Sequence, residues 1–86
     1  MNIQLGDLIE IAWVDSFAED GWMAAESAAT ATPVGFCRTA GYVLAINDDW
    51  LTITSSWSKM GSVFGFISIP TRAITSTTVL VEHAMG

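Results

Sequence analysis

The chain has 86 residues, of which 51% are hydrophobic and only 14% are charged, a composition typical of one small globular domain spanning residues 1–86. Nine acidic residues against three Lys and Arg give a formal net charge of −6. Because long nucleic acids and anionic membrane surfaces bind through Lys and Arg, this charge argues against duplex DNA, long RNA and membranes as partners.

Three features of the sequence bear on its location. The uncharged run at 60–71 has twelve residues and contains Gly, Ser and Pro, whereas a membrane span needs roughly 18–20 apolar residues. The start M-N-I-Q-L-G-D lacks the basic region of a signal peptide. Cys37 is the only cysteine, so no internal disulfide can form, which fits a reducing compartment. We therefore expect a location in the cytoplasm.

The first predicted element is a strand at residues 7–15, where apolar residues such as Ile9 and Ile11 alternate with smaller or polar ones. Residues 16–33 are rich in Ala, Ser, Thr and acidic residues, and they predict a long excursion between the first two strands. Within that excursion, residues 22–29 favour a short helix of two turns.

Further strands are predicted by β-branched and aromatic residues separated by short turns. They cover residues 36–46, 50–57 and 62–69, and a last strand follows from residue 75. The turns lie at 47–49 and 58–61, where Asn, Asp, Ser and Gly gather.

The chain between the last two strands indicates how the sheet closes. Pro70 has no amide hydrogen and holds Ile69 extended, so the fourth strand should end there. Hydrophobic residues return at Ala73 and Ile74, which leaves room for a single 3-10 turn. We predict an all-β fold, a small SH3-like barrel of about five antiparallel strands, with a long loop after the first strand and a 3-10 turn before the last. Its predicted core is Ile9, Ile11, Val43, Leu51, Ile53, Phe66, Ile69, Ile74 and Leu80.

The first candidate binding group surrounds the end of the first strand. Asp15 and Ser16 lie between Trp13 and Trp22 in the sequence, and such a group predicts a polar pair in an aromatic cleft. In the alternative interpretation, Asp15 and Ser16 only cap the loop through their own hydrogen bonds, and the two Trp rings close the end of the barrel.

The second candidate group is Arg38, Thr39 and Gly41 in the second strand. An Arg side chain can fork a phosphate or a carboxylate, and a Gly within a strand often marks a close approach by a ligand or another backbone. The alternative is an internal ion pair of Arg38 with Asp15 or Glu10.

The sequence gives no support for catalysis or for a metal or other cofactor. One His and one Cys without motif spacing do not make a metal site. His83 lies in the last few residues, where chains are usually poorly ordered, which argues against a general base there. We expect a protein that is not an enzyme.

Four short motifs are similar to those of a family of small, uncharacterised proteins encoded by bacteriophages and prophages. They are I-E-I-A-W-V-D-S at 9–16, G-W at 21–22, C-R-T-A-G-Y-V-L at 37–44 and I-P-T-R-A-I at 69–74. The resemblance implies an SH3-like barrel in the cytoplasm of an infected bacterial cell, and it brings no established activity. Phages also make sponge proteins that oppose CBASS and Thoeris immunity by sequestering nucleotide signals, and the chain resembles these in size.

Two classes of function follow. The first is a non-catalytic binding protein for an anionic, nucleotide-like molecule held between Trp13 or Trp22 and Arg38, with phage counter-defence as its context. The second is a protein–protein interaction or structural module without a small ligand. In both cases the surplus of aromatic residues and the uncharged segment 60–71 predict a homo-oligomer.

Overall fold

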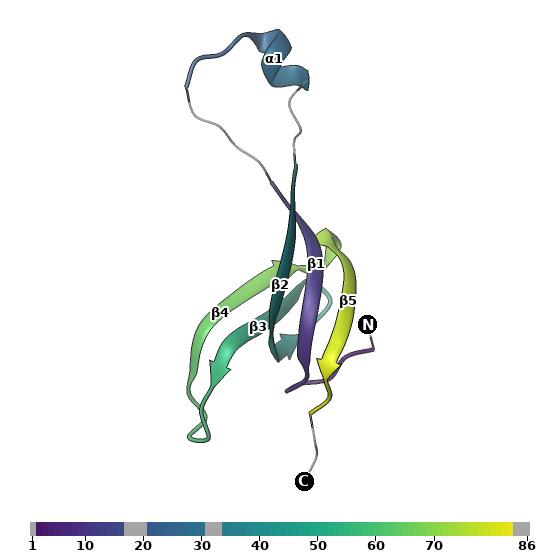
Figure 1. The fold of residues 1–86 in the computed structure, drawn as a ribbon, viewed down its shortest axis with the longest axis vertical. Helices are drawn as coiled ribbons and strands as arrows, with labels where there is room; N and C mark the ends of the chain where they lie inside the picture. The colour runs from purple at the N-terminus through teal and green to yellow at the C-terminus, as the bar shows by residue number, and fades with distance from the viewer. Residues whose placement is uncertain (1, 17–20, 31–33, 84–86) are drawn as a thin grey trace.

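Five antiparallel strands form one sheet in the computed structural model, which describes residues 2–16, 21–30 and 34–83 (Figure 1). The order across the sheet is β4-β3-β2-β1-β5, so the last strand pairs with the first. The sheet is strongly curved, and the predicted all-β, barrel-like class is confirmed. The strands are β1 (Leu8–Ser16), β2 (Val34–Ile46), β3 (Trp50–Trp57), β4 (Val63–Pro70) and β5 (Ile74–Val81).

The predicted 3-10 turn is also confirmed, as η1 (Thr71–Ala73) between β4 and β5. It is bonded to the turn that joins β2 and β3. The Thr71 amide donates to the carbonyl oxygen of Asp49 at 3.0 Å, and the Thr71 hydroxyl donates to that of Asp48 at 2.6 Å. These two bonds hold η1 against a segment more than twenty residues away in the sequence.

The excursion between β1 and β2 carries the short helix α1 (Ala25–Thr30), which begins three residues later than the start of the predicted helical segment. The paired ends of β1 and β2 leave the sheet as a two-stranded ribbon, and α1 lies at the far end of it (Figure 1). All described residues of the excursion, 21–30, are exposed. The molecule is therefore elongated, with extents of 58 × 25 × 21 Å.

The core lies on the concave face of the sheet, and strand alternation decides which residues reach it. Six of the nine predicted core residues are fully buried, and Ile74 packs against them half-buried. The prediction is wrong for Phe66 (67% exposed) and Leu80 (51% exposed). Each lies an odd number of residues from an inward-facing neighbour, Ile69 and Val79 respectively, so each points away from the core. The buried residues are Ile3, Ile9, Ile11, Val43, Leu51, Ile53 and Ile69, with Asp7 and Thr54 as buried polar side chains.

Candidate functional site

The residues predicted as one binding group lie on opposite faces of the sheet. In the β1–β2 ladder Thr39 is the partner of Ile11 and Arg38 is the partner of Ala12. Because successive residues of a strand face opposite sides, Thr39 points with Ile11 to the core side and Arg38 points outward. On the core side, Trp13 donates its indole N–H to the Thr39 hydroxyl at 2.9 Å.

The outward-facing Arg38 forms the internal ion pair that was one of the two sequence interpretations. Its guanidinium donates to one carboxylate oxygen of Glu10, from Nη2 at 2.6 Å and from Nε at 3.1 Å. The hydrogen bond with Glu10 and the opposite charge raise the pKa of Arg38 above its usual value. The Arg38 side chain is 74% exposed, so this is a surface pair, and Trp13 lies on the other side of the sheet from it.

The other predicted residues fall in three further places. Trp22 is fully exposed in the excursion, far from the sheet. Gly41 is buried, and a Cβ there would lie 2.9 Å from the carbonyl oxygen of Thr54, so the close neighbour is backbone. Asp15 lines a cleft together with Trp13. Ser16 is the last residue of β1, and its side chain lies outside the described part of the structure.

A cleft with a volume of about 800 Å³ lies at the end of the sheet opposite α1. Tyr42 of β2 and Trp57 of β3 provide aromatic walls, each less than half exposed. We call it the Lys59 cleft. Its lining residues are Leu5, Gly6, Tyr42, Ser55, Ser56, Trp57, Ser58, Lys59 and His83.

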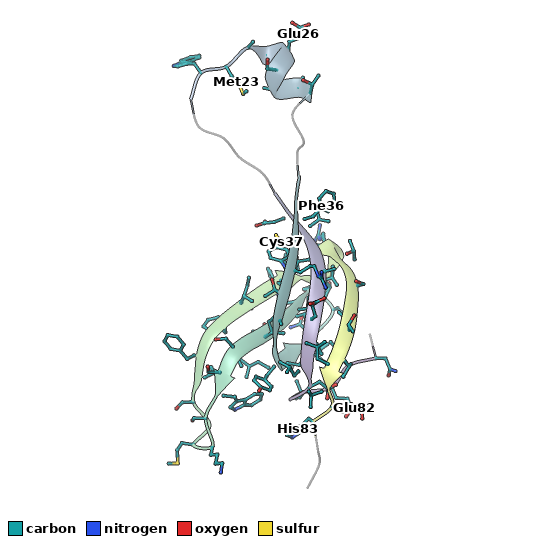
Figure 2. All side chains as sticks on the ribbon, viewed as in Figure 1. Met23, Glu26, Phe36, Cys37, Glu82 and His83 are labelled. Atoms are coloured by element: carbon teal, nitrogen blue, oxygen red, sulfur yellow. The ribbon has the colours of Figure 1, made fainter. Side chains whose placement is uncertain are left out.

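His83 follows β5, and the fold fixes its position at this cleft (Figure 2). Its backbone N–H donates to the Asp7 carboxylate at 2.9 Å. Its ring packs on Gly6, where an added Cβ would lie 2.7 Å from His83 Cγ. His83 therefore has defined contacts in the structure, although it lies in the last few residues of the sequence.

The turn that carries Lys59 is held by the hydroxyl of Ser58. That oxygen accepts the backbone N–H groups of Met60 at 3.2 Å and Ser62 at 3.1 Å. Two backbone bonds close the same turn, from the Ser58 amide to the Ser62 carbonyl and from the Gly61 amide to the Ser58 carbonyl. The backbone that positions Lys59 beside the cleft is thus well defined.

The surroundings of Lys59 contain fewer carboxylates than those of the other two basic side chains, Arg38 and Arg72. Arg38 is neutralised by Glu10, and Arg72 shares its cleft with Asp15 and Asp49. No Asp or Glu is among the residues that line the Lys59 cleft. The nearby Asp7 already accepts the backbone N–H groups of His83 and Gln4, which lower its pKa. An anion in this cleft would lie near the Lys59 ammonium, and no Asp or Glu among the lining residues would repel it.

The second cleft, of about 460 Å³, lies between the end of β1, the start of β3 and η1. Trp13 and Trp50 line it with Pro70, and Trp50 is 49% exposed. Asn47 fixes the start of β3, because its side-chain oxygen accepts the backbone N–H groups of both Asp49 and Trp50 at 2.8 Å. We call it the Trp50 cleft.

Most residues of the Lys59 cleft escaped the sequence analysis. Gly6 and His83 are 77 residues apart in the sequence, so no pattern of neighbouring residues indicates that they lie in contact. The run S-S-W-S-K at 55–59 was the only local signal, since it places a Trp, a Lys and three hydroxyls together at the end of a strand. Trp50 and Arg72 of the second cleft likewise come from strand and turn ends that only the fold brings together.

Among the described residues, no group of three or more His, Cys, Asp or Glu side chains is placed to hold a metal ion. No helix in residues 2–16, 21–30 and 34–83 is long and apolar enough to cross a membrane. In comparisons with protein-family models, with curated proteins and with solved structures, none matched this chain.

Proposed function

We propose that this protein is a non-catalytic binding protein for a small anionic molecule with an aromatic ring, of the nucleotide class, and that the ligand occupies the Lys59 cleft. The observation that carries the proposal is the placement of Lys59 and His83 beside two aromatic rings in a wall without a carboxylate. The ligand class is the one expected from the sequence, but the site is a different one.

The parts of the cleft suit the parts of a nucleotide. Tyr42 and Trp57 offer ring faces on which a base can stack, an interaction of about 1–3 kcal/mol per base. The ammonium of Lys59 can meet a phosphate, and serine hydroxyls add neutral donors. The net charge of −6 repels any anion at long range, but screening over about 8 Å at physiological salt limits this penalty for a small ligand.

The biological context of the proposal comes from the sequence resemblance to phage and prophage proteins. In an infected bacterial cell, a protein that holds a nucleotide immune signal without turning it over would lower its free concentration and so oppose host defence. The proposal accordingly places the protein in the host cytoplasm.

Isothermal titration calorimetry with a panel of cyclic dinucleotides and ADP-ribose derivatives tests the proposal. We expect heat of binding with the wild type and at least a tenfold loss of affinity in Lys59→Ala. Arg38→Ala is the matched control, because it removes the same unit of charge from a surface pair on another part of the sheet. It should keep the wild-type affinity if the local cation, and not the overall field, binds the ligand.

Two results would contradict the proposal. No heat from any member of the panel would remove the nucleotide class, and loss of binding in Arg38→Ala with retention in Lys59→Ala would move the site to the outer face of the sheet. Circular dichroism of each variant shows whether the fold is intact, so that a loss of binding can be assigned to the side chain.

A second candidate function, a protein–protein interaction module, is favoured by the Trp50 cleft. Its walls come from three segments of the chain and include two Trp residues, and aromatic-lined grooves can take an extended peptide. Trp50→Ala and Trp57→Ala separate the two functions, since each removes one half-exposed Trp from one cleft. Nucleotide binding should be lost only in Trp57→Ala.

A further inference from the structure

The strand β4 forms one edge of the sheet, and its residues 63–68 are exposed, whereas Ile69 near its end is buried in the core. Among the described residues it pairs only with β3. Phe64 (78% exposed) and Phe66 (67% exposed) point to one side, and Val63 and Ile67, each more than a third exposed, point to the other. Such an edge presents unpaired backbone groups beside apolar side chains, which is a template for pairing with another strand.

This edge lacks the features that usually prevent such pairing. Charged residues, especially Lys, and internal prolines protect natural edge strands. Residues 60–71 contain no charge, and Pro70 is the last residue of β4. Gly65 has a φ of 72°, yet the residues on either side of it remain in register with β3.

The exposed area of the chain is also larger than its mass predicts. The accessible surface is 6559 Å², whereas a compact monomer of 9.2 kDa exposes about 4,900 Å². The ribbon and α1, which extend away from the sheet (Figure 1), and the exposed residues of β4 both contribute to the excess. A stable interface of standard size buries roughly 800 Å² on each partner, so part of this excess is enough for one.

We propose that a second copy of this chain covers β4, by antiparallel pairing of the two β4 strands across a two-fold axis. Two copies that each carry a net charge of −6 repel one another, and this repulsion is weakest at an uncharged surface such as that of 60–71. The other edge, β5, carries the polar run T-S-T-T at 75–78 directly after Ile74, and its exposed large apolar residues, Leu80 and Val81, lie only at its end.

The choice of β4 for both partners also follows from symmetry. Pairing of β4 with β5 of another copy would leave a free β4 and a free β5 at the ends, so it would grow as a filament or close only as a ring of several copies. Self-pairing of β4 closes after two copies and joins the two sheets into one of ten strands. The dimer pairs the free backbone groups of β4 and covers part of its exposed aromatic side chains.

Light scattering of purified protein at micromolar concentration tests this interface. We expect twice the 9.2 kDa mass for the wild type and the single mass for Phe64→Lys. Phe36→Lys is the matched control, because Phe36 is a Phe of β2 that is 82% exposed, and it lies on the ribbon away from β4 (Figure 2). It should remain dimeric. A monomeric wild type, a dimeric Phe64→Lys or a monomeric Phe36→Lys would overturn the proposal.

Thiol cross-linking distinguishes self-pairing from other arrangements. In a Cys37→Ser background, Phe66→Cys places one thiol in the middle of β4, and Leu80→Cys places one on the other edge strand. A short bifunctional cross-linker should give a covalent dimer with Phe66→Cys and none with Leu80→Cys. Cross-linking only when the two variants are mixed would show a β4–β5 contact and overturn the two-fold pairing.

Discussion

Asp7 is the residue whose side chain joins the two ends of the chain. One carboxylate oxygen accepts the N–H of Gln4 and the other accepts that of His83, both at 2.9 Å. The Asp7 backbone takes part as well, because its carbonyl accepts the N–H of Val43 at 2.8 Å. The residue therefore organises the segment before β1, the segment after β5 and one wall of the Lys59 cleft together.

The stability of the protein should depend on the charge of Asp7. The hydrogen bonds from His83 and Gln4 lower its pKa in the folded state, so the carboxylate stabilises the fold above the ordinary value of 3.8. This contribution is lost as the pH falls through the lowered, folded-state pKa. We expect Asp7→Asn to have a lower urea midpoint than the wild type at pH 7 and the difference to shrink in acid.

Asp48→Asn serves as the control for this measurement, because it removes the same charge from an exposed turn. Its urea midpoint should stay near that of the wild type at both pH values. A difference between wild type and Asp7→Asn that persists unchanged in acid would show that the carboxylate charge does not stabilise the fold.

At the scale of the strands, the close contact between β2 and β3 depends on the absence of a side chain at Gly41. A Cβ at Gly41 would lie 2.9 Å from the Thr54 carbonyl oxygen and 3.1 Å from Ile53 Cδ1. Gly41→Ala should therefore force the two strands apart and destabilise the fold by about 1–3 kcal/mol in urea unfolding. Gly35→Ala in the same strand should be neutral or slightly stabilising, since nothing lies within 4 Å of its Cβ. Equal effects of the two substitutions would contradict this account.

The strands themselves were predictable from the sequence because the patterns that define a strand involve only residues close together in the sequence. Alternation along residues 7–15 and the proline at position 70 act on neighbouring residues, so β1 and the end of β4 were placed within one residue. The core prediction was wrong at Phe66 because the alternation of inward and outward side chains along β4 was not applied there. Both errors in the core prediction lie on the edge strands.

The candidate site was not predictable in the same way. Arg38 and Thr39 are neighbours in the sequence, but strand geometry separates their side chains to opposite faces. Lys59 and His83 are distant in the sequence and line the same cleft because the ends of β3 and β5 lie at one end of the sheet. Alternation along β1 puts Trp13 on the same face as Ile9 and Ile11, and alternation along β2 puts Arg38 on the face opposite to Val43, so the two patterns together would have separated Arg38 from Trp13.

At the scale of the whole molecule, the sheet and the excursion behave as separate parts of the fold. Ser16 and Val34 are paired across the ribbon, and none of residues 21–30 is buried. Replacing 17–33 with the two-residue turn Asn-Gly should therefore leave the sheet folded. We expect an equal or higher urea midpoint, because shortening a loop from 17 to 2 residues lowers the entropy cost of closing it, by on the order of 1–2 kcal/mol.

A variant in which 17–33 becomes a Gly-Ser linker of the same length is the control for this experiment. It keeps the length of the loop and removes its sequence, so its stability should equal that of the wild type. Unfolding of either variant would show that the excursion stabilises the sheet.

The elongated form has a consequence for how the protein moves through solution. The radius of gyration is 16.4 Å, against about 12 Å for a compact chain of this length, and the long axis is more than twice either of the others. Friction grows with such asymmetry, so a single copy should elute from a gel-filtration column ahead of globular standards of equal mass. Its rotational diffusion should be anisotropic as well. The NMR relaxation rates of backbone amides should therefore depend on how each N–H bond is oriented relative to the long axis, so amides of the β1–β2 ribbon should differ from amides oriented otherwise.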